Sequence, residues 1–247
     1  MPNTQDMIQK IEELSFNAMP ALKQIMYDGW LLRFSGGYTR RANSVNPIYH
    51  SNIETLSKIK YCEQSYQREN IPLIFKMTEL AHPIGLDRLF EEQGYKKSDY
   101  VSVQIADIAG IRPDIEAEEM VVPDDKWVEE YLKMAGYDIK FMKTVQILAA
   151  ETIPEKAFMR ICVKGETVAV GYAAVEDGFT GIYDLAVTEK YRQKGYGRQM
   201  MFNLLEFGRK NGAQNAYLQV IETNKPALAL YSSLGFKESY KYWYRSK

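Results

Sequence analysis

The sequence predicts an α/β fold with a mixed (α+β) sheet, and three observations predict it. Residues 182–187 form an apolar, β-prone run that leads through a glycine turn into an amphipathic run at residues 199–209. From residue 124 onward, helix and strand patterns follow in the order α-α-β-β-β-α-β-α-β. A long stretch of the first half also matches the second half without a gap, which is typical of a duplicated unit.

The elements of the first half follow from periodicity and from turn residues. Residues 5–16 have apolar positions at helical spacing, and residues 30–34 read as a strand that ends at a Gly-Gly turn. A short helix at 86–93 is stopped by Gly94, and residues 100–105 form the last strand. Glycine, proline and acidic residues gather between 108 and 119. We therefore divide the chain into residues 1–113 and residues 114–247.

The second half begins with two predicted helices and a hairpin. Asp124 or Asp125 caps a helix that carries apolar and aromatic residues, and a second helix covers residues 139–150. Residues 158–164 and 167–175 form a hairpin, and an Asp-Gly turn leads into the strand that starts at Phe179. A strand at 216–222 and a helix that ends near residue 234 complete the pattern.

Composition favours a soluble enzyme. The chain of 247 residues carries a net charge of −1, so no global basic field attracts nucleic acid. No run of 18 apolar residues or apolar leader is present, so we expect a cytoplasmic protein that is a monomer or a homodimer and does not bind membranes. Both cysteines are expected to be buried, and the isolated histidines predict no metal site.

The repeat has an offset of 141 residues (231 − 90). It places residues 90–96 on 231–237 and residues 71–77 on 212–218. It also places residues 53–70 on 194–211, helix on helix, and residues 41–47 on 182–188, strand on strand. Any strand–helix–strand pair can align to some degree, but the ungapped length of this match favours duplication.

The turn at residues 192–198 indicates an anion-binding site. Gly195 and Gly197 stand at a helix start, where backbone N–H groups and the helix dipole favour negative charge. Basic residues crowd the same turn, so a pyrophosphate fits better than a single carboxylate: Lys190, Arg192, Lys194 and Arg198.

The string Arg-x-x-Gly-x-Gly after a strand that ends Leu-Ala-Val resembles the acetyl-CoA motif of the GNAT superfamily of N-acetyltransferases. The resemblance continues through a strand at 216–222 and Asn224-Lys225-Pro226 to the block Leu230–Phe236, which is similar to the family's "LYxxLGF" helix end. It covers about half the chain. A dinucleotide-binding turn is disfavoured because Met200 stands where the third glycine of that motif belongs.

The resemblance implies a GNAT fold, with two GNAT-like halves in tandem, and acetyl-CoA as co-substrate. The GNAT strand at 185–187 splays from its parallel neighbour, and the gap receives the pantetheine arm as a pseudo-strand. Asn224 contacts this arm or caps the helix that follows it, and these roles are compatible. The implied acyl-CoA contacts are Leu185, Ala186, Val187, Arg192, Gln193, Lys194, Gly195, Tyr196, Gly197, Arg198 and Asn224.

Transfer of an acetyl group to an amine needs an acid and a base. Helical spacing points Tyr231 inward, and the resemblance implies that its hydroxyl, with a pKa near 10, protonates the departing thiolate. Asp184, Glu222 or a water relay takes the proton from the amine, and the sequence does not choose between them. Strand alternation places Asp184 and Ala186 on one face and Tyr183, Leu185 and Val187 on the other.

The two halves are not equivalent. At the offset of 141, Gly195 becomes Glu54, Gly197 becomes Leu56 and Tyr231 becomes Phe90, so only the C-terminal half is expected to bind acetyl-CoA. The N-terminal half is expected to extend the sheet and to wall the acceptor site.

The polar segment 39–47 is predicted to be a core strand of the N-terminal half. We expect it to bind the acceptor through Arg40, Arg41 and Asn43, with a solvated strand end as the simpler alternative.

Three function classes follow from these observations. The leading one is an acetyl-CoA-dependent N-acetyltransferase for a primary amine of a small molecule or a protein. The others are an aminoacyl or longer-chain acyl transferase of the tandem type, and a non-catalytic acyl-CoA sensor. The presence of Tyr231 together with Gly195 and Gly197 disfavours the sensor.

Overall fold

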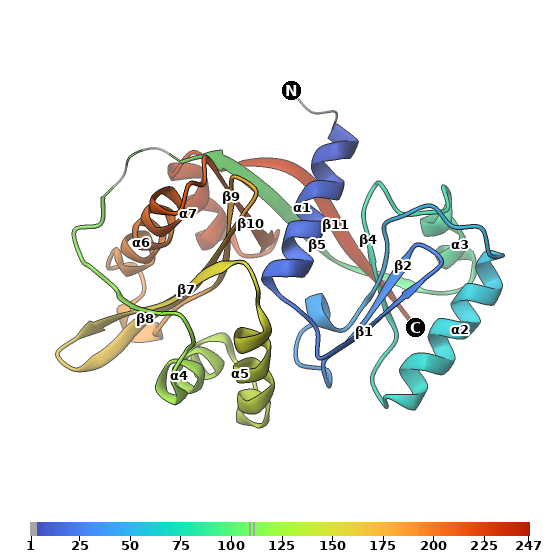
Figure 1. The fold of residues 1–247 in the computed structure, drawn as a ribbon, viewed down its shortest axis with the longest axis horizontal. Coiled ribbons are helices and arrows are strands. Elements are labelled where there is room, and N and C mark those ends of the chain that lie inside the picture. The colour runs from blue at the N-terminus through green and yellow to red at the C-terminus, as the bar shows by residue number, and fades with distance from the viewer. Residues whose placement is uncertain (1–3, 109, 111) are drawn as a thin grey trace. The chain divides into compact units, whose positions relative to one another are not determined.

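The computed structural model describes residues 4–108, 110 and 112–247, which fold into two compact units. The first unit consists of residues up to Ser102 together with Tyr240–Lys247, and the second consists of Val103–Ser239. Figure 1 shows the elements of both. The units therefore do not coincide with the two halves of the sequence, because each half contributes a strand end to the other unit. The division into functional halves at residue 113 stays a prediction.

The first unit has the strand order β1-β2-β3-β4-β11-β5. Its strands β1 and β2 form an antiparallel hairpin, and β3 runs parallel to β4. Its elements are α1 (Thr4–Ala18), β1 (Lys23–Tyr27), β2 (Trp30–Phe34), a 3-10 turn (Arg40–Ala42), β3 (Val45–Pro47), α2 (Thr55–Arg68), β4 (Ile74–Met77), α3 (Leu86–Glu92) and β5 (Lys96–Asp107).

The second unit has the strand order β5-β10-β9-β8-β7-β6. Its helix–strand order from residue 124 is the predicted one, so this prediction is confirmed. Its elements are β6 (Glu118–Met120), α4 (Asp125–Ala135), a 3-10 turn (Ile139–Phe141), α5 (Met142–Glu151), β7 (Glu155–Val163), β8 (Glu166–Glu176), β9 (Phe179–Val187), a 3-10 turn (Glu189–Tyr191), α6 (Tyr196–Lys210), β10 (Asn215–Ile221) and α7 (Lys225–Ser233). Strand β11 (Lys237–Ser246) starts in this unit, and its residues from Tyr240 onward belong to the first unit.

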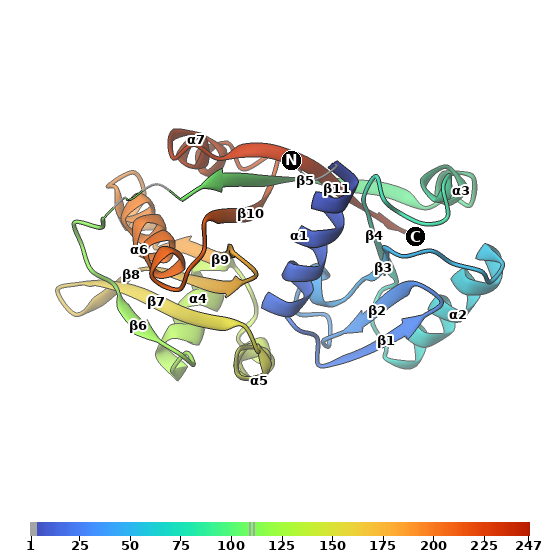
Figure 2. The same ribbon diagram turned by 45° about the horizontal axis from the view of Figure 1, so that its top comes forward.

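Helices α6 and α4 cover the two faces of the second unit's sheet (Figure 2). The α6 face is mainly aliphatic, and its core cluster includes Ile182 and Leu218 from the sheet with Met200 and Leu204 from α6. The α4 face is aromatic: Trp127 stacks on Tyr131 at 5.4 Å between ring centroids. The aromatic residues of the α4 face include Tyr131, whose hydroxyl lies 3.0 Å from the carboxylate of Asp184 in β9.

The end of β11 is tied to the first unit by a buried arginine. Arg245 donates two hydrogen bonds of 2.9 Å to the Asp87 carboxylate at the start of α3, and the Trp243 indole N–H donates a third of 2.6 Å. Burial opposes ionisation of Asp87, but the hydrogen bonds from Arg245 and Trp243 outweigh it and lower the pKa of Asp87 to about 2.

We expect Asp87→Asn to destabilise the protein by about 2 kcal/mol near neutral pH, because it removes the charge that compensates buried Arg245. The contribution of a carboxyl with a depressed pKa is present above its unfolded pKa near 4 and is lost as the pH falls toward 2. Urea unfolding at pH 7, 4 and 2.5 measures this. The difference between wild type and variant should shrink with falling pH, and a constant difference would contradict the assignment.

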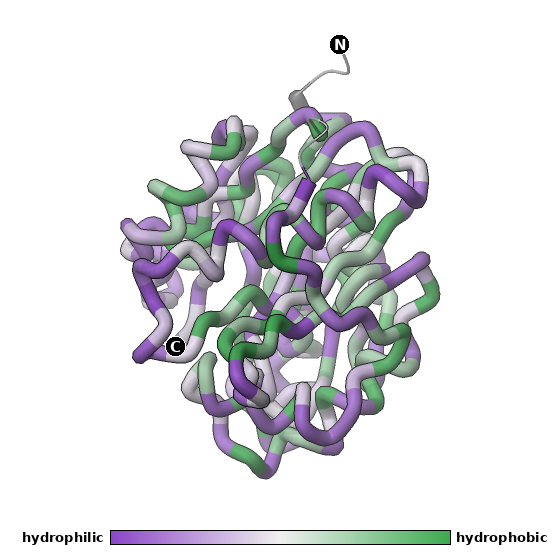
Figure 3. The backbone as a smooth tube through the Cα atoms, turned by 90° about the vertical axis from the view of Figure 1, so that its left-hand side faces the viewer, coloured by the Kyte–Doolittle hydropathy of each residue, from purple (hydrophilic) through white to green (hydrophobic). Residues whose placement is uncertain are grey.

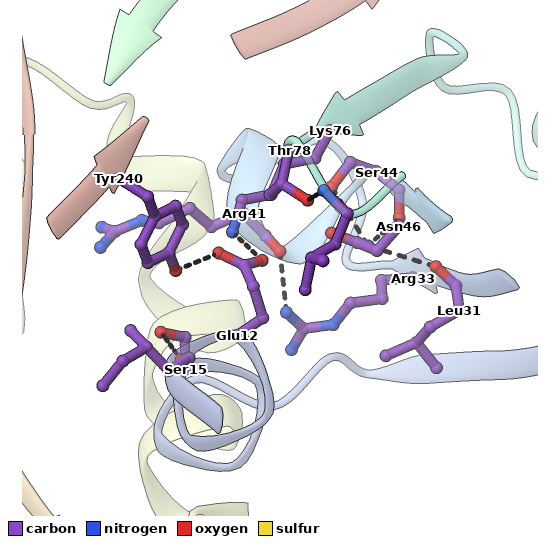
Figure 4. A network of polar contacts seen from close by, with 12 residues as sticks. Glu12, Ser15, Leu31, Arg33, Arg41, Ser44, Asn46, Lys76, Thr78 and Tyr240 are labelled. Atoms are coloured by element: carbon purple, nitrogen blue, oxygen red, sulfur yellow. Dashed lines mark hydrogen bonds and ion pairs between the residues drawn. The ribbon is translucent and has the colours of Figure 1, made fainter. Parts of the chain in front are cut away.

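A second buried ion pair joins α1 to β4 (Figure 4). Glu12 and Lys76 are only 3% and 4% exposed, and their side chains meet at 2.5 Å. The Tyr240 hydroxyl donates to the other Glu12 oxygen at 2.7 Å, and the Lys76 ammonium lies 4.1 Å from the centre of the Tyr242 ring. Charges so deeply buried are stable only while each keeps its partner.

The predictions for three segments were wrong or incomplete. Residues 40–42 form a 3-10 turn, so the predicted strand at 41–47 shrinks to Val45–Pro47. The cause is Asn43, whose side-chain oxygen accepts from the backbone N–H groups of Ser35 and Gly37 and whose amide donates to the Thr39 carbonyl. Strands β1 and β6 were not predicted. Cys162 is exposed, beside a register shift in β7, whereas Cys62 is buried as expected.

Hydrophobic and hydrophilic residues alternate over short distances along the chain, as the tube in Figure 3 shows. Within the described residues, no helix combines the length and apolar character needed to cross a bilayer. The same residues contain no group of three or more His, Cys, Asp or Glu side chains placed to hold a metal ion.

Candidate active site

The turn before α6 has the geometry of an anion-binding site. Gln193 and Gly195 adopt left-handed backbone conformations with φ of 60° and 86°, and Gly195 is the N-cap of α6. As a glycine, Gly195 has no side chain that could cap this helix end. The first N–H groups of a helix lack intrahelical acceptors, so those of residues 195–198 can receive an external anion.

Gly197 lies within the first turn of α6. A Cβ atom at this position would meet Leu230 and Val187 at 3.5 and 3.6 Å, which is ordinary contact. The protein's own packing therefore does not require glycine here, and any requirement comes from what binds at the helix end.

The basic side chains of the turn are only partly available to a ligand. Lys190 is paired with Glu166 at 2.6 Å, and Arg198 donates to the Ser233 hydroxyl at 2.8 Å. The Arg192 side chain donates to the Val187 carbonyl at 3.2 Å, and its residue is exposed, as is Lys194. Arg192 and Lys194 are thus the basic groups best placed to meet phosphate oxygens.

Strands β9 and β10 diverge next to this turn. Their parallel pairing starts at Phe179 with Asn215 and ends at Ile182 with Leu218, although β9 continues to Val187 and β10 to Ile221. The predicted splay is confirmed. Residues 184–187 are half-exposed while residues 179–183 are buried, so the backbone beyond the last pair is accessible as a sheet edge.

Tyr231 lies on α7 with its ring in the core that α6 shares with the sheet. Its residue is only 9% exposed, and its ring centroid lies 6.0 Å from that of Phe236. Among the described residues, none forms a hydrogen bond with its hydroxyl. Burial raises the pKa of Tyr231 to about 12, above the value near 10 expected from the sequence, so the hydroxyl stays protonated.

Asp184 lies at a bulge in β9. Tyr172 pairs with Tyr183 and Val170 with Ala186, so Gly171 faces two residues, and Asp184 has a φ of 52°. The predicted alternation was therefore wrong for Tyr183 and Asp184, whereas Leu185 and Val187 share one face as predicted. The bulge turns Asp184 to the α4 face that Tyr183 also occupies, and Leu185 and Val187 pack with the α6 face.

The Tyr131 hydroxyl donates a hydrogen bond of 3.0 Å to Asp184. Tyr131 is one of the aromatic residues of the helix predicted to start after Asp124 or Asp125, and this contact was not predicted. The signal was a hydroxyl among the buried aromatic residues of α4, since a buried tyrosine hydroxyl usually finds a partner.

Glu222 and Asn224 follow β10, and the structure shows a contact for Asn224 at the start of α7. The Asn224 side chain accepts from the Ala227 N–H at 3.2 Å, with Pro226 in the first turn, which confirms the cap of α7. Contact of Asn224 with the pantetheine arm stays a prediction. Glu222 follows the last residue of β10 and is half-exposed.

In the first unit, a carboxylate lies at the start of α2, the helix that begins 141 residues before α6. The Glu54 carboxylate caps α2 by accepting from the N–H groups of Leu56 and Ser57 at 2.9 and 2.8 Å. These hydrogen bonds lower the pKa of Glu54. Elements also recur at the offset of 141, because α2, β4 and β5 start at 55, 74 and 96, and α6, β10 and β11 start at 196, 215 and 237.

The predicted acceptor-binding residues lie in the first unit. Arg40 is 43% exposed, pairs with Asp99 and lies 4.6 Å from the centre of the Tyr244 ring. The carbonyl of Arg41 accepts from Arg33 at 2.8 Å, and Asn43 is buried among the backbone groups described above. The side chains of Arg40 and Asn43 thus already have partners within the first unit. The acceptor-binding role of Arg40, Arg41 and Asn43 stays a prediction.

Comparisons with known proteins agree with this arrangement. Among solved structures, a GCN5-related N-acetyltransferase from Kribbella flavida covers 97% of this chain and 95% of its own, with a TM-score of 0.68 and 16% identity. A tandem GNAT protein from the clavulanic acid biosynthesis pathway covers 96% and 87%, with a TM-score of 0.60 and 11% identity. At these identities the likeness shows the fold, which is the GNAT fold.

Sequence relatives identify the family. The family described as "Probable histone acetyltransferase Rv0428c C-terminal" matches residues 5–245, and the chain belongs to it. The Bacillus subtilis protein named as the uncharacterized N-acetyltransferase YobR is 30% identical over 253 residues, which cover 98% of this chain and 99% of the relative. The Mycobacterium tuberculosis "Probable histone acetyltransferase Rv0428c" is 28% identical over 93% of this chain and 70% of its own.

The chain is accordingly an acyltransferase, a GNAT-type N-acetyltransferase that uses an acyl-CoA and an acceptor substrate.

Proposed function

We propose that this enzyme transfers the acetyl group of acetyl-CoA to a primary amine of a small molecule or a protein, by direct attack in a ternary complex. The observation that carries the proposal is the end of β9–β10 pairing at Ile182 and Leu218, beside the uncapped start of α6. The backbone of residues 185–187 then pairs with the pantetheine amides. The amides of residues 193–198 hold the pyrophosphate, with Arg192 and Lys194 beside them.

The reaction needs two proton movements. The amine nitrogen attacks the thioester carbonyl carbon, a C–N bond forms and the C–S bond breaks. Asp184, directly or through water, takes the proton that the nitrogen loses, and Tyr231 donates a hydrogen bond and then a proton to the departing sulfur. Support comes from the lack of any hydrogen-bond partner for the Tyr231 hydroxyl within the described residues, and from the half-exposed position of Asp184 at the bulge.

The N-terminal half is proposed to be a degenerate copy that does not bind acetyl-CoA. The recurrence of element starts at 141 residues supports duplication, and the Glu54 carboxylate lies on the helix amides that a phosphate needs. A tandem GNAT protein is among the structures of similar fold.

Release of CoA thiol over a panel of amines, followed by mass spectrometry of the products, tests the proposal. Relatives that match part of the chain include a streptothricin acetyltransferase and a [Ribosomal protein bS18]-alanine N-acetyltransferase. The panel should therefore contain small-molecule amines and peptides with free N-termini. Amine-dependent thiol release with a product heavier by one acetyl group is expected. Release without an acetylated product, or a product only from longer acyl-CoA donors, would count against acetyl transfer.

We expect Gly197→Glu to weaken acetyl-CoA binding by roughly tenfold or more, because a carboxylate then stands at the helix end that receives phosphates. Gly197→Ala is the matched control, since a Cβ fits this position without a clash. Glu54→Ala should leave binding unchanged. Calorimetry measures all three, and two CoA sites per chain or an unaffected Gly197→Glu would show that the asymmetry of the halves is wrong.

A further inference from the structure

The bulge in β9 fixes where the Asp184 carboxylate points. A left-handed conformation is unusual for aspartate within a strand, and it turns the side chain toward α4. Neighbouring residues leave the strand little freedom. A Cβ atom on Gly181 would come within 2.6 Å of both the Tyr183 ring and the Tyr217 hydroxyl, and these two hydroxyls are 2.7 Å apart. The backbone that carries Asp184 is therefore held by close aromatic packing.

Tyr131 reaches Asp184 from a rigid helix. Its residue is 3% exposed, its ring stacks on Trp127, and the Trp127 indole N–H donates to the Met159 carbonyl at 2.8 Å. Asp124 caps α4 through the Trp127 N–H at 2.7 Å and is held by Arg160 at 2.8 Å. These contacts fix the Tyr131 ring, so its hydroxyl has a defined position when it donates to Asp184 at 3.0 Å.

We propose that Tyr131 is a positioning residue for the reaction, whose hydroxyl keeps the Asp184 carboxylate ionised and oriented to take the proton of the acceptor amine. This inference rests on the proposed role of Asp184 as base. A hydrogen bond donated to a carboxylate stabilises its charged form, and that effect offsets the cost of placing the charge beside buried aromatic rings.

Phenols from three elements lie on the face of the sheet that carries Asp184. Tyr131 comes from α4, Tyr172 from β8 and Tyr183 from β9 itself. Burial raises the pKa of Tyr172, and the negative charge of Asp184 contributes to the rise. A phenol ordinarily has a pKa near 10, far above the range where a carboxylate titrates, so we expect the pH dependence of proton removal to follow the carboxylate.

The test is the pH profile of kcat/KM for thiol release. Tyr131→Phe should move the acid limb upward by about one pH unit, the effect of losing one hydrogen bond of ordinary net strength. Asp184→Asn should abolish this limb and lower the rate by about 10²–10⁴. Tyr66→Phe is the control: it also removes a buried hydroxyl, bonded to the Arg33 carbonyl at 3.0 Å in the first unit, and should leave the limb in place.

Two results would overturn the inference. The first would contradict only the role of Tyr131, and the second would also contradict the role of Asp184 as base. An acid limb unmoved in Tyr131→Phe but lost in Asp184→Asn would leave Asp184 as the base and Tyr131 as a packing residue. Wild-type rate and profile in Asp184→Asn would remove the base assignment, and the role of Tyr131 with it. Acetylated product in that variant would still support acetyl transfer.

Discussion

Tyr231→Phe is expected to lower turnover by about 10²–10³, the usual range for loss of a general acid. The substitution keeps the ring in the core and removes only the hydroxyl. That hydroxyl makes no hydrogen bond within the described residues, so stability and acetyl-CoA affinity should change little. Because the hydroxyl acts mainly in the transition state, kcat and kcat/KM should fall together.

The raised pKa of Tyr231 indicates that its hydroxyl stabilises the departing thiolate more by hydrogen bonding than by full proton transfer. A phenol with a pKa of about 12 transfers its proton uphill to a thiolate whose conjugate acid has a pKa near 8.5. Donation of a hydrogen bond while the C–S bond breaks is therefore the larger part of its effect. Steady-state and single-turnover kinetics of both proteins measure this. A near-wild-type kcat, with chemistry shown to be rate-limiting, would make Tyr231 an ordinary core residue.

The second large effect is expected at the Glu12–Lys76 pair. Glu12→Ala should destabilise the protein by about 3–5 kcal/mol, because it leaves the Lys76 ammonium buried without its counter-charge. Desolvation already lowers the pKa of Lys76, and Glu12 is the group that opposes this shift. Lys76→Met should be destabilising in the same range.

The double variant Glu12→Ala with Lys76→Met is the matched control. It removes both charges, so it should be less destabilised than the sum of the two single variants, with the loss of the Tyr240 hydrogen bond remaining. Urea unfolding of the four proteins closes the cycle. Additive single effects would mean that the two charges do not stabilise each other in the folded state.

Much of the fold could be predicted because helix starts and glycine turns are local signals. The turn before α6, the cap of α7 by Asn224 and the order of elements after residue 124 all follow from residues adjacent in sequence. The exchange of β5 and β11 could not be predicted, since an apolar pattern shows that a strand is buried and not which strand it pairs with.

The part of the candidate site in which backbone N–H groups receive an anion could be predicted from the sequence. The contacts between catalytic side chains were harder to predict. The glycines indicate the α6 turn, but nothing in the run Tyr183-Asp184-Leu185 indicates a bulge, so strict alternation placed Asp184 and Tyr183 on opposite faces of the strand. The contact between Tyr131 and Asp184 joins residues far apart in sequence and depends on that bulge.

The exchange of strand ends has a consequence for synthesis. The first unit is not complete without Tyr240–Lys247, which the ribosome adds only after the residues of the second unit, although its other residues end at Ser102. At ordinary rates of translation the 137 intervening residues (103–239) take roughly ten seconds. During that interval Arg245 and Tyr240 have not yet been synthesised. The carboxylates of Asp87 and Glu12 in the nascent first unit therefore lack the hydrogen bonds that these two residues donate in the folded protein.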